Sequence, residues 1–243
     1  MDTPVFKNGL ENITDPKVYT ENTPFPSGVL DNFLQQDVVN AVLLEWPDQE
    51  AFNTKAEGTS VKSWLSDSSK FGPETQKLFE VLNGVDFLKE LERVTGIPNL
   101  IADPSLEGGG LHMITRGGFL KIHADFNWHL KMSKMRMINL LVYLNEDWNE
   151  EWGGHLELIG PPETLDTKVT IAPLNNRAVL FNTTSDSWHG HPEPLKCPEN
   201  RQRKSIALYY YSADEPQPEV AHYTLYREDL ERPALEFENH YYL

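Results

Sequence analysis

The stretch YLNEDWNEEWGGHLEL, residues 143–158, contains two short apolar runs joined by an acidic turn. Trp148 lies in the turn, and the pair Gly153 and Gly154 directly precedes the second run. Turn residues between short runs of alternating apolar and polar side chains are typical of antiparallel strands. We therefore interpret this stretch as a strand, a turn and a partner strand.

The same pattern of short apolar runs separated by turn residues extends over about residues 106–212. The region before it has apolar residues at helical spacing. Residues 27–47 predict a short strand followed by a helix, for which Asp31 is a candidate N-cap, and the apolar residues of 72–84 and 85–96 recur at helical intervals. The later region predicts strands near residues 111–115, 119–125, 136–144, 154–159, 167–172, 177–182, 186–191 and 204–211. Helices followed by many short strands predict an α+β fold, with the N-terminal helices packed on one face of a β-sandwich or jelly roll.

Length and charge narrow the class of protein. A chain of 243 residues suits one domain, or one domain with a modest appendage. It carries 37 acidic against 21 basic residues, a formal net charge of −16, which argues against general affinity for nucleic acid or anionic membranes. The single cysteine, Cys197, excludes an intrachain disulfide. The chain shows no signal peptide and no apolar run of about 18 residues, so we expect a cytoplasmic protein.

Two residues of the segment GGFLKIHADFNWH, residues 117–129, are candidate metal ligands. Side chains two apart on a strand share a face, so His123 and Asp125 would point the same way. A third ligand must come from elsewhere, and the segment SWHGH after a strong apolar strand offers His189 and His191. Two imidazoles and one carboxylate with open positions are the donor set of non-haem Fe(II) oxygen chemistry.

A basic residue follows these histidines at the start of another predicted strand, RKSIALYYY. Arg203 opens this strand, and Ser205 shares its face. A buried arginine is costly unless it meets an anion, and its guanidinium is suited to binding a carboxylate. Arg201 is an alternative, but Arg203 directly precedes the apolar part of the strand. We therefore expect an anion to lie close to the metal.

The order of these motifs resembles the 2-oxoglutarate/Fe(II)-dependent dioxygenases, in their prolyl 4-hydroxylase-like branch. The resemblance covers about residues 108–212 and is most specific over YLNEDWNEEWGGHLEL. It implies a double-stranded β-helix. We expect a single domain over residues 1–243, with helical support and an arm over about 1–105, the β-helix core over 106–212 and a C-terminal tail over 213–243.

The resemblance also assigns roles to individual residues. It implies that Fe(II) is held by His123, Asp125 and the histidine immediately before a glycine, which selects His189 over His191. His191 would then lie behind the ligands or in a loop, facing outward. The cosubstrate 2-oxoglutarate would be bound through its distal carboxylate, and the residues matched to this role are Arg203, Tyr143 and, more weakly, Ser205. The residues that flank the site and could contact substrate are Trp128, His129 and Trp188.

The implied activity is hydroxylation of a C–H bond, most readily that of a prolyl residue in a protein or peptide. The reaction would consume 2-oxoglutarate and dioxygen and release succinate and carbon dioxide, with ascorbate as a further cofactor. Three alternatives stay open. The same chemistry could act on a free amino acid or small metabolite; a cupin-type metal enzyme would not need Arg203; and a non-catalytic binding module could keep the fold, although intact ligands argue against it.

Overall fold

The structure is a computed structural model that describes residues 5–161, 168–214 and 220–227. The helices are α1 (Lys17–Thr20), α2 (Gln36–Leu44), α3 (Pro73–Leu82) and α4 (Val85–Thr95), with short 3-10 turns η1 (Leu10–Asn12), η2 (Gln49–Ala51), η3 (Ser68–Lys70) and η4 (Glu150–Trp152). The strands are β1 (Ser27–Asp31), β2 (Asn53–Glu57), β3 (Ser60–Leu65), β4 (Leu100–Ala102), β5 (Gly110–Ile114), β6 (Phe119–Ala124), β7 (Trp128–His129), β8 (Lys134–Tyr143), β9 (Leu156–Ile159), β10 (Lys168–Ile171), β11 (Arg177–Asn182), β12 (Trp188–His191), β13 (Arg203–Ser212) and β14 (Leu225–Tyr226). Each of the eight strands predicted over residues 111–211 has a counterpart in the structure.

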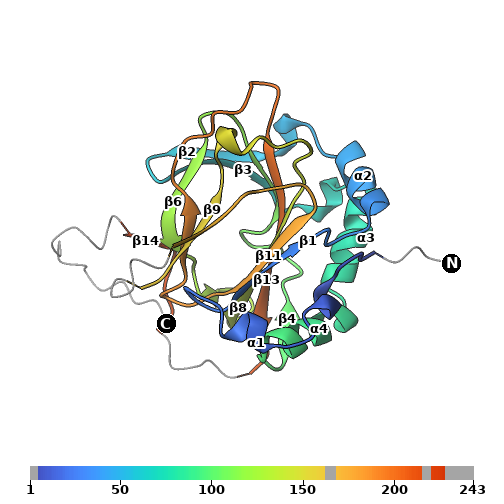
Figure 1. Cartoon of the computed structure of the whole chain (residues 1–243), viewed down its shortest axis with the longest axis vertical. Coiled ribbons are helices and arrows are strands. Elements are labelled where there is room, and N and C mark those ends of the chain that lie inside the picture. The colour runs from blue at the N-terminus through green and yellow to red at the C-terminus, as the bar shows by residue number, and fades with distance from the viewer. Residues whose placement is uncertain (1–4, 162–167, 215–219, 228–243) are drawn as a thin grey trace.

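The strands form two facing layers of one strongly curled antiparallel sheet (Figure 1). One layer has the order β1-β11-β8-β13-β5, the other has the order β6-β12-β9-β10, and β3 pairs with both β5 and β6 to join them. Successive strands of the chain alternate between the layers, from β5 to β6 to β8 to β9. This is the double-stranded β-helix that the sequence predicts, and it confirms the α+β fold class.

Alternation along β8 shows how the layers are filled. Ile138, Leu140 and Val142 belong to the large core beneath the helices, whereas Leu141 and Tyr143 face the interior between the two layers. Burial of one such aliphatic side chain stabilises the fold by about 1.5–3 kcal/mol. Both faces of this strand are therefore buried, and only its inner face can contribute to a site inside the barrel.

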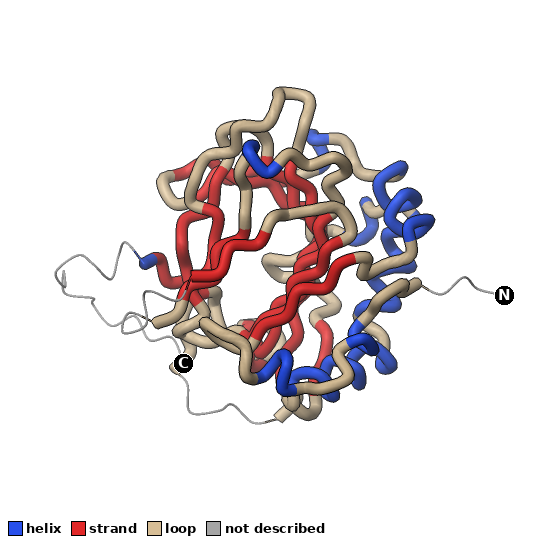
Figure 2. The backbone as a smooth tube through the Cα atoms, in the orientation of Figure 1, coloured by secondary structure: helices blue, strands red, loops and turns tan. Residues whose placement is uncertain are grey.

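The helices cover the outer face of the β1-β11-β8-β13-β5 layer, as predicted (Figure 2). Helix α3 begins at Pro73, where the missing N–H of proline costs nothing, and α4 ends at Gly96, whose φ of 73° suits glycine. Asp31 is not the N-cap of α2. It ends β1 and forms an ion pair with Arg177, while Gln35 occupies the capping position.

The hairpin of β2 and β3 was not predicted, because its sequence is polar and lacks clear alternation. Its pairing depends on β5 and β6, which lie more than 45 residues further along the chain. The part of the C-terminal tail that is described packs back on the barrel, where Leu225 pairs with Ala124 and Tyr226 with His123. Within the described residues, no helix has the length and apolar character needed to cross a membrane.

Candidate active site

Three side chains from the inner face of the barrel converge at one point. His123 and His189 lie opposite each other in the β6–β12 pairing, and Asp125 follows β6 directly. The Nε2 atoms of the two histidines each lie 3.3 Å from an oxygen of Asp125, and the three ligand atoms all lie within 4.8 Å of one another. Neighbouring ligands at roughly 2.1 Å from a shared metal are separated by about 3 Å, so the spacing fits one ion.

The hydrogen bonds behind the two imidazoles leave their Nε2 lone pairs facing the cluster. The Nδ1 of His123 donates to the carbonyl of Lys121 at 2.8 Å, and the Nδ1 of His189 donates to the carbonyl of Ser187 at 2.9 Å. A neutral ring that donates from Nδ1 carries its lone pair on Nε2. Burial, and then the neighbouring His189, lower the pKa of His123, which disfavours protonation. Two lone pairs and a carboxylate that face each other are the donor set of a divalent cation.

Asp125 is held by a buried arginine and an amide. Its Oδ2 accepts from Arg136 at 2.8 Å and from Asn139 at 2.7 Å. Burial alone would raise the pKa of Asp125, but the Arg136 guanidinium and the two histidines outweigh it and hold this pKa well below its usual value. Arg136 is itself 1% exposed and stacks on the ring of Tyr209, with 3.3 Å from Cζ to the ring centroid. The carboxylate is thus oriented and kept ionised, with Oδ1 left for a metal.

We expect Arg136→Gln to weaken metal binding about 10- to 100-fold, because the variant removes the charge that keeps Asp125 ionised and oriented. Chelator competition would measure the affinity for Fe(II), and circular dichroism would show that the fold is intact. Arg116→Gln is the matched control, since Arg116 is half-exposed and pairs with Glu199 at 3.5 Å at the surface. Unchanged affinity in a folded Arg136→Gln variant would contradict the role given to Arg136.

Arg203 lies inside the barrel without an anionic partner. It is 5% exposed, and its Nε donates to the carbonyl of Gly154 at 2.8 Å. One terminal nitrogen donates to the hydroxyl of Tyr143 at 3.2 Å. No carboxylate pairs with Arg203 in the part of the chain that the structure describes. A buried guanidinium that lacks a carboxylate is suited to hold the acid group of a ligand.

Gly153 and Gly154, in the turn between β8 and β9, position Arg203. Gly154 has φ 74°, and a Cβ there would come within 2.9 Å of the Arg203 Cδ and 2.7 Å of a Leu195 methyl carbon. Trp148 fixes the same turn, because its indole N–H donates to the carbonyl of Gly153 at 3.2 Å. The turn between β8 and β9 therefore supplies both the space and an acceptor for Arg203.

One pocket connects the candidate metal ligands with Arg203. It is lined by Lys62, His112, Ile114, Leu120, His123, Asp125, Asn139, Leu141, Leu156, His189, Gly190, His191, Arg203, Ser205 and Tyr209. Ser205 lies beside Tyr143 in the β8–β13 pairing, so the structure brings the three residues predicted to hold 2-oxoglutarate together. His191 also lines this pocket rather than facing outward, and its two ring nitrogens have no hydrogen-bond partner among the described residues. Burial lowers the pKa of His191 well below its usual value, so it offers a neutral imidazole.

The structure does not bring the three predicted substrate contacts to the pocket. His129 is fully buried, with Nε2 3.3 Å from an oxygen of Asp103 and Nδ1 accepting from the Met132 amide, which leaves no surface for a substrate. Trp188 packs with Ala124 and Ile159 on the face of β12 opposite His189. Trp128, in the short strand β7, is absent from the pocket lining.

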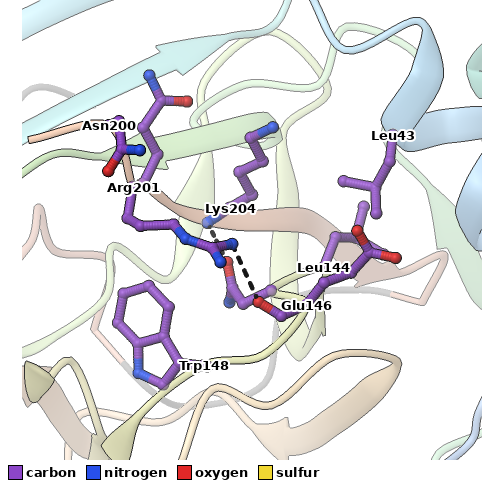
Figure 3. Close-up of a pocket in the computed structure, with 9 residues that line it drawn as sticks. Leu43, Leu144, Glu146, Trp148, Asn200, Arg201 and Lys204 are labelled. Atoms are coloured by element: carbon purple, nitrogen blue, oxygen red, sulfur yellow. Dashed lines mark hydrogen bonds between the residues drawn. The ribbon is translucent and has the colours of Figure 1, made fainter. Parts of the chain in front are cut away.

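A second hollow lies on the outside of the barrel (Figure 3). Arg201 lies there above Trp148, with one terminal nitrogen 3.4 Å from the carbonyl oxygen of Glu146. Arg201 precedes β13 and lines this outer hollow, whereas Arg203 is the first residue of β13 and lines the inner pocket, so the two arginines lie on different sides of the β8–β13 layer. This separates the two candidates and favours Arg203 as the carboxylate-binding residue.

Sequence reasoning gave no role to Lys62, Arg136 or Asn139. The alternation of β8 predicts Asn139 on the inner face with Tyr143, since the two are four apart, but it does not predict the hydrogen bond from Asn139 to Asp125. Arg136 enters a predicted strand as a charged residue among apolar ones, which was a usable signal. Lys62 gave none, because its strand was not recognised.

Comparisons with known proteins agree with this geometry. Residues 109–211 match the family model of the 2OG-Fe(II) oxygenase superfamily. Similar solved structures include a prolyl-4-hydroxylase from Pseudomonas putida, at 16% identity over 82% of this chain and 100% of that chain, with a TM-score of 0.59. A prolyl hydroxylase from Trichoplax adhaerens, in complex with a peptide of hypoxia inducible factor, shares 21% identity over 84% of this chain and 90% of that chain, with a TM-score of 0.59.

HygX from Streptomyces hygroscopicus, with nickel, 2-oxoglutarate and hygromycin B bound, shares 16% identity over 77% of this chain and 83% of that chain, with a TM-score of 0.51. At these identities the likeness shows a common fold. No curated protein sequence matches the chain. The segment that matches the family model, residues 109–211, carries the three candidate metal ligands and Arg203.

Proposed function

We propose that this protein is a 2-oxoglutarate- and Fe(II)-dependent dioxygenase that hydroxylates a prolyl residue in a protein or peptide. The observation that carries the proposal is the pocket in which His123, Asp125 and His189 converge and Arg203 lies without a carboxylate partner. When bound, Fe(II) and 2-oxoglutarate would supply the oxidising power for C–H hydroxylation. The protein's own groups bind, orient and exclude water.

Each group of the pocket has a definite task in that reaction. His123 and His189 each offer an imidazole nitrogen, and Asp125 offers a carboxylate oxygen, so three positions of an octahedral ion would remain open. Arg203 would hold the distal carboxylate of 2-oxoglutarate, helped by the hydroxyl of Tyr143. The apolar side chains of Leu141 and Leu156 keep the space between the two ends poor in water, which strengthens the charged contacts.

Two comparisons support a prolyl substrate over other choices. The Pseudomonas putida and Trichoplax adhaerens structures are named as prolyl hydroxylases, and the second contains a peptide. HygX favours a second candidate, since it has the same fold with hygromycin B bound. The same chemistry on a free amino acid or small metabolite is therefore the alternative. A cupin-type enzyme without 2-oxoglutarate fits less well, because nothing in its chemistry uses Arg203. Ascorbate and a cytoplasmic location stay predictions.

Succinate release from 2-oxoglutarate tests the proposal. We expect the Fe(II)-loaded protein to form succinate faster with proline-containing peptides than with free amino acids or no substrate. The screen includes ribosomal and collagen-like peptides, and mass spectrometry locates the added oxygen on proline. Stimulation by a free amino acid but by no peptide would support the alternative, and turnover that is independent of 2-oxoglutarate would overturn the proposal.

A further inference from the structure

Lys62 extends from the strand that joins the two layers into the same pocket as the metal ligands. It belongs to β3 and lines the pocket together with His123, Asp125 and Arg203. Asp125 is the only acidic residue in that lining. Lys62 thus adds a second basic side chain to a pocket in which Arg203 already lacks a carboxylate partner among the described residues.

The Lys62 ammonium has no hydrogen-bond or ion-pair partner in the part of the chain that the structure describes. Within the described residues, neither a hydrogen bond nor an ion pair to Lys62 is formed, and the oxygens of Asp125 face His123, His189, Arg136 and Asn139. Burial lowers the pKa of Lys62, and the charge of Asp125 opposes that effect only in part. Burying an ammonium without a partner is costly, so the arrangement is complementary to an anion that enters the pocket.

The position of Lys62 separates it from Arg203. Arg203 pairs with Ile114 across β13 and β5, and Ser63 pairs with Met113 across β3 and β5. Lys62 therefore lies two strands from Arg203 in nearly the same row, which places their Cα atoms about 10 Å apart. The ammonium is on the β3 side of the pocket, and the Arg203 guanidinium is tied to Tyr143 and the β8–β9 turn on the other side.

The charges of the proposed ligands leave Lys62 available. Asp125 is already compensated by Arg136, with 2.8 Å between them. Of the two carboxylates of 2-oxoglutarate, Arg203 would hold the distal one and the metal would hold the other. No acid group of the pocket lining or of the cosubstrate would then remain for Lys62, and the next anion to enter the pocket would belong to the substrate.

We propose that Lys62 binds a carboxylate of the substrate close to the C–H bond that is hydroxylated, and so selects acidic substrates. The inference rests on the proposed function and makes its substrate class narrower. The carboxylate can come from an acidic side chain next to the target proline or from the free α-carboxylate of an amino acid. Both sources present the same group to the ammonium, and the test separates them.

The test compares matched acidic and neutral ligands with three proteins. The ligands are proline peptides with Glu or Gln beside the proline, and L-proline beside L-prolinamide. The proteins are wild type, Lys62→Met and Lys55→Met. Lys55, on β2, pairs directly with Lys62, on β3, but does not line the pocket. It is therefore a control of equal charge on the neighbouring strand of the same hairpin.

Wild type should favour the acidic member of at least one pair about 10- to 100-fold in kcat/KM, as one charge-assisted contact predicts. Lys62→Met should lose that preference, whereas Lys55→Met should keep it. The affinity for 2-oxoglutarate, measured in the same Lys62→Met protein, should stay close to that of wild type. Fluorescence anisotropy of the labelled peptides on the Mn(II)- and 2-oxoglutarate-loaded protein gives the same comparison without turnover.

Two outcomes overturn the inference. One is a wild-type protein that binds no acidic ligand better than its neutral partner; the other is a Lys62→Met variant that loses 2-oxoglutarate affinity and keeps the preference. If the proposed function is wrong, wild type forms no succinate. The anisotropy comparison needs no turnover, so it still tests the role of Lys62. Preference for the Glu peptide identifies a side-chain carboxylate, and preference for L-proline identifies a free amino acid.

Discussion

His189→Ala should abolish tight Fe(II) binding, whereas His191→Ala should keep most of it. Both histidines lie on β12 and both line the pocket, but only His189 joins the cluster with His123 and Asp125. The loss of one of three protein ligands should exceed the 10- to 100-fold cost of losing a supporting contact. The ring nitrogens of His191 do not belong to the cluster, so removing its imidazole should lower the metal affinity by no more than about 10-fold.

Iron content after anaerobic loading and desalting measures this difference, and chelator competition gives the affinities. His155→Ala is a useful control, because His155 is partly exposed and lies beside Glu150, with 3.4 Å between its Nε2 and a carboxylate oxygen. A His191→Ala protein that loses iron while His189→Ala retains it would reverse the assignment. Because both variants delete an imidazole from the same strand, a general loss of folding would affect both alike.

Arg203→Ala should abolish 2-oxoglutarate binding and spare metal binding. The variant would leave the distal carboxylate buried without a cation, which costs about 2–5 kcal/mol, or roughly thirtyfold to several-thousandfold in affinity. Under anaerobic conditions, Fe(II) with 2-oxoglutarate should give a weak visible charge-transfer band in wild type. Arg203→Ala should lack this band at concentrations that saturate wild type.

Arg201→Ala is the matched control for Arg203→Ala. Arg201 lies two residues earlier but in the outer hollow, where it contacts the carbonyl of Glu146. It should therefore keep the band and the affinity for 2-oxoglutarate. Turnover that persists in Arg203→Ala without 2-oxoglutarate would favour the cupin-type alternative. Loss of the band in Arg201→Ala alone would show that the two arginines were assigned in the wrong order.

Much of the barrel could be predicted from the sequence because its strands carry local signals. The stretch around Gly153 and Gly154 contains both the turn chemistry and the apolar runs that it connects, and two-residue alternation places His123 near Asp125. The resemblance then selected His189 and Arg203, which the structure places in one pocket.

The parts that were not predicted depend on contacts between distant segments. The strand that carries Lys62 pairs with strands more than 45 residues away, and its own sequence is polar. His129 appears in the sequence as a neighbour of the metal motif, but a partner 26 residues earlier, Asp103, holds it in the core. Tertiary context of this kind leaves no local pattern. The outward prediction for His191 was wrong for a different reason, because it set aside the two-residue alternation that places His191 on the same face of β12 as His189.

The strand β3 closes the barrel, but it lies outside the segment that matches the family model. Residues 109–211 contain most strands of both layers, but β1, Ser27–Asp31, lies outside them, and so does β3, Ser60–Leu65, which connects the strands β5 and β6. A chain shortened to the matched segment would present the backbone amides and carbonyls of both strands to solvent, and such open edges promote aggregation. It would also lose Lys62, so the boundary that sequence likeness suggests cuts through the barrel and through its pocket.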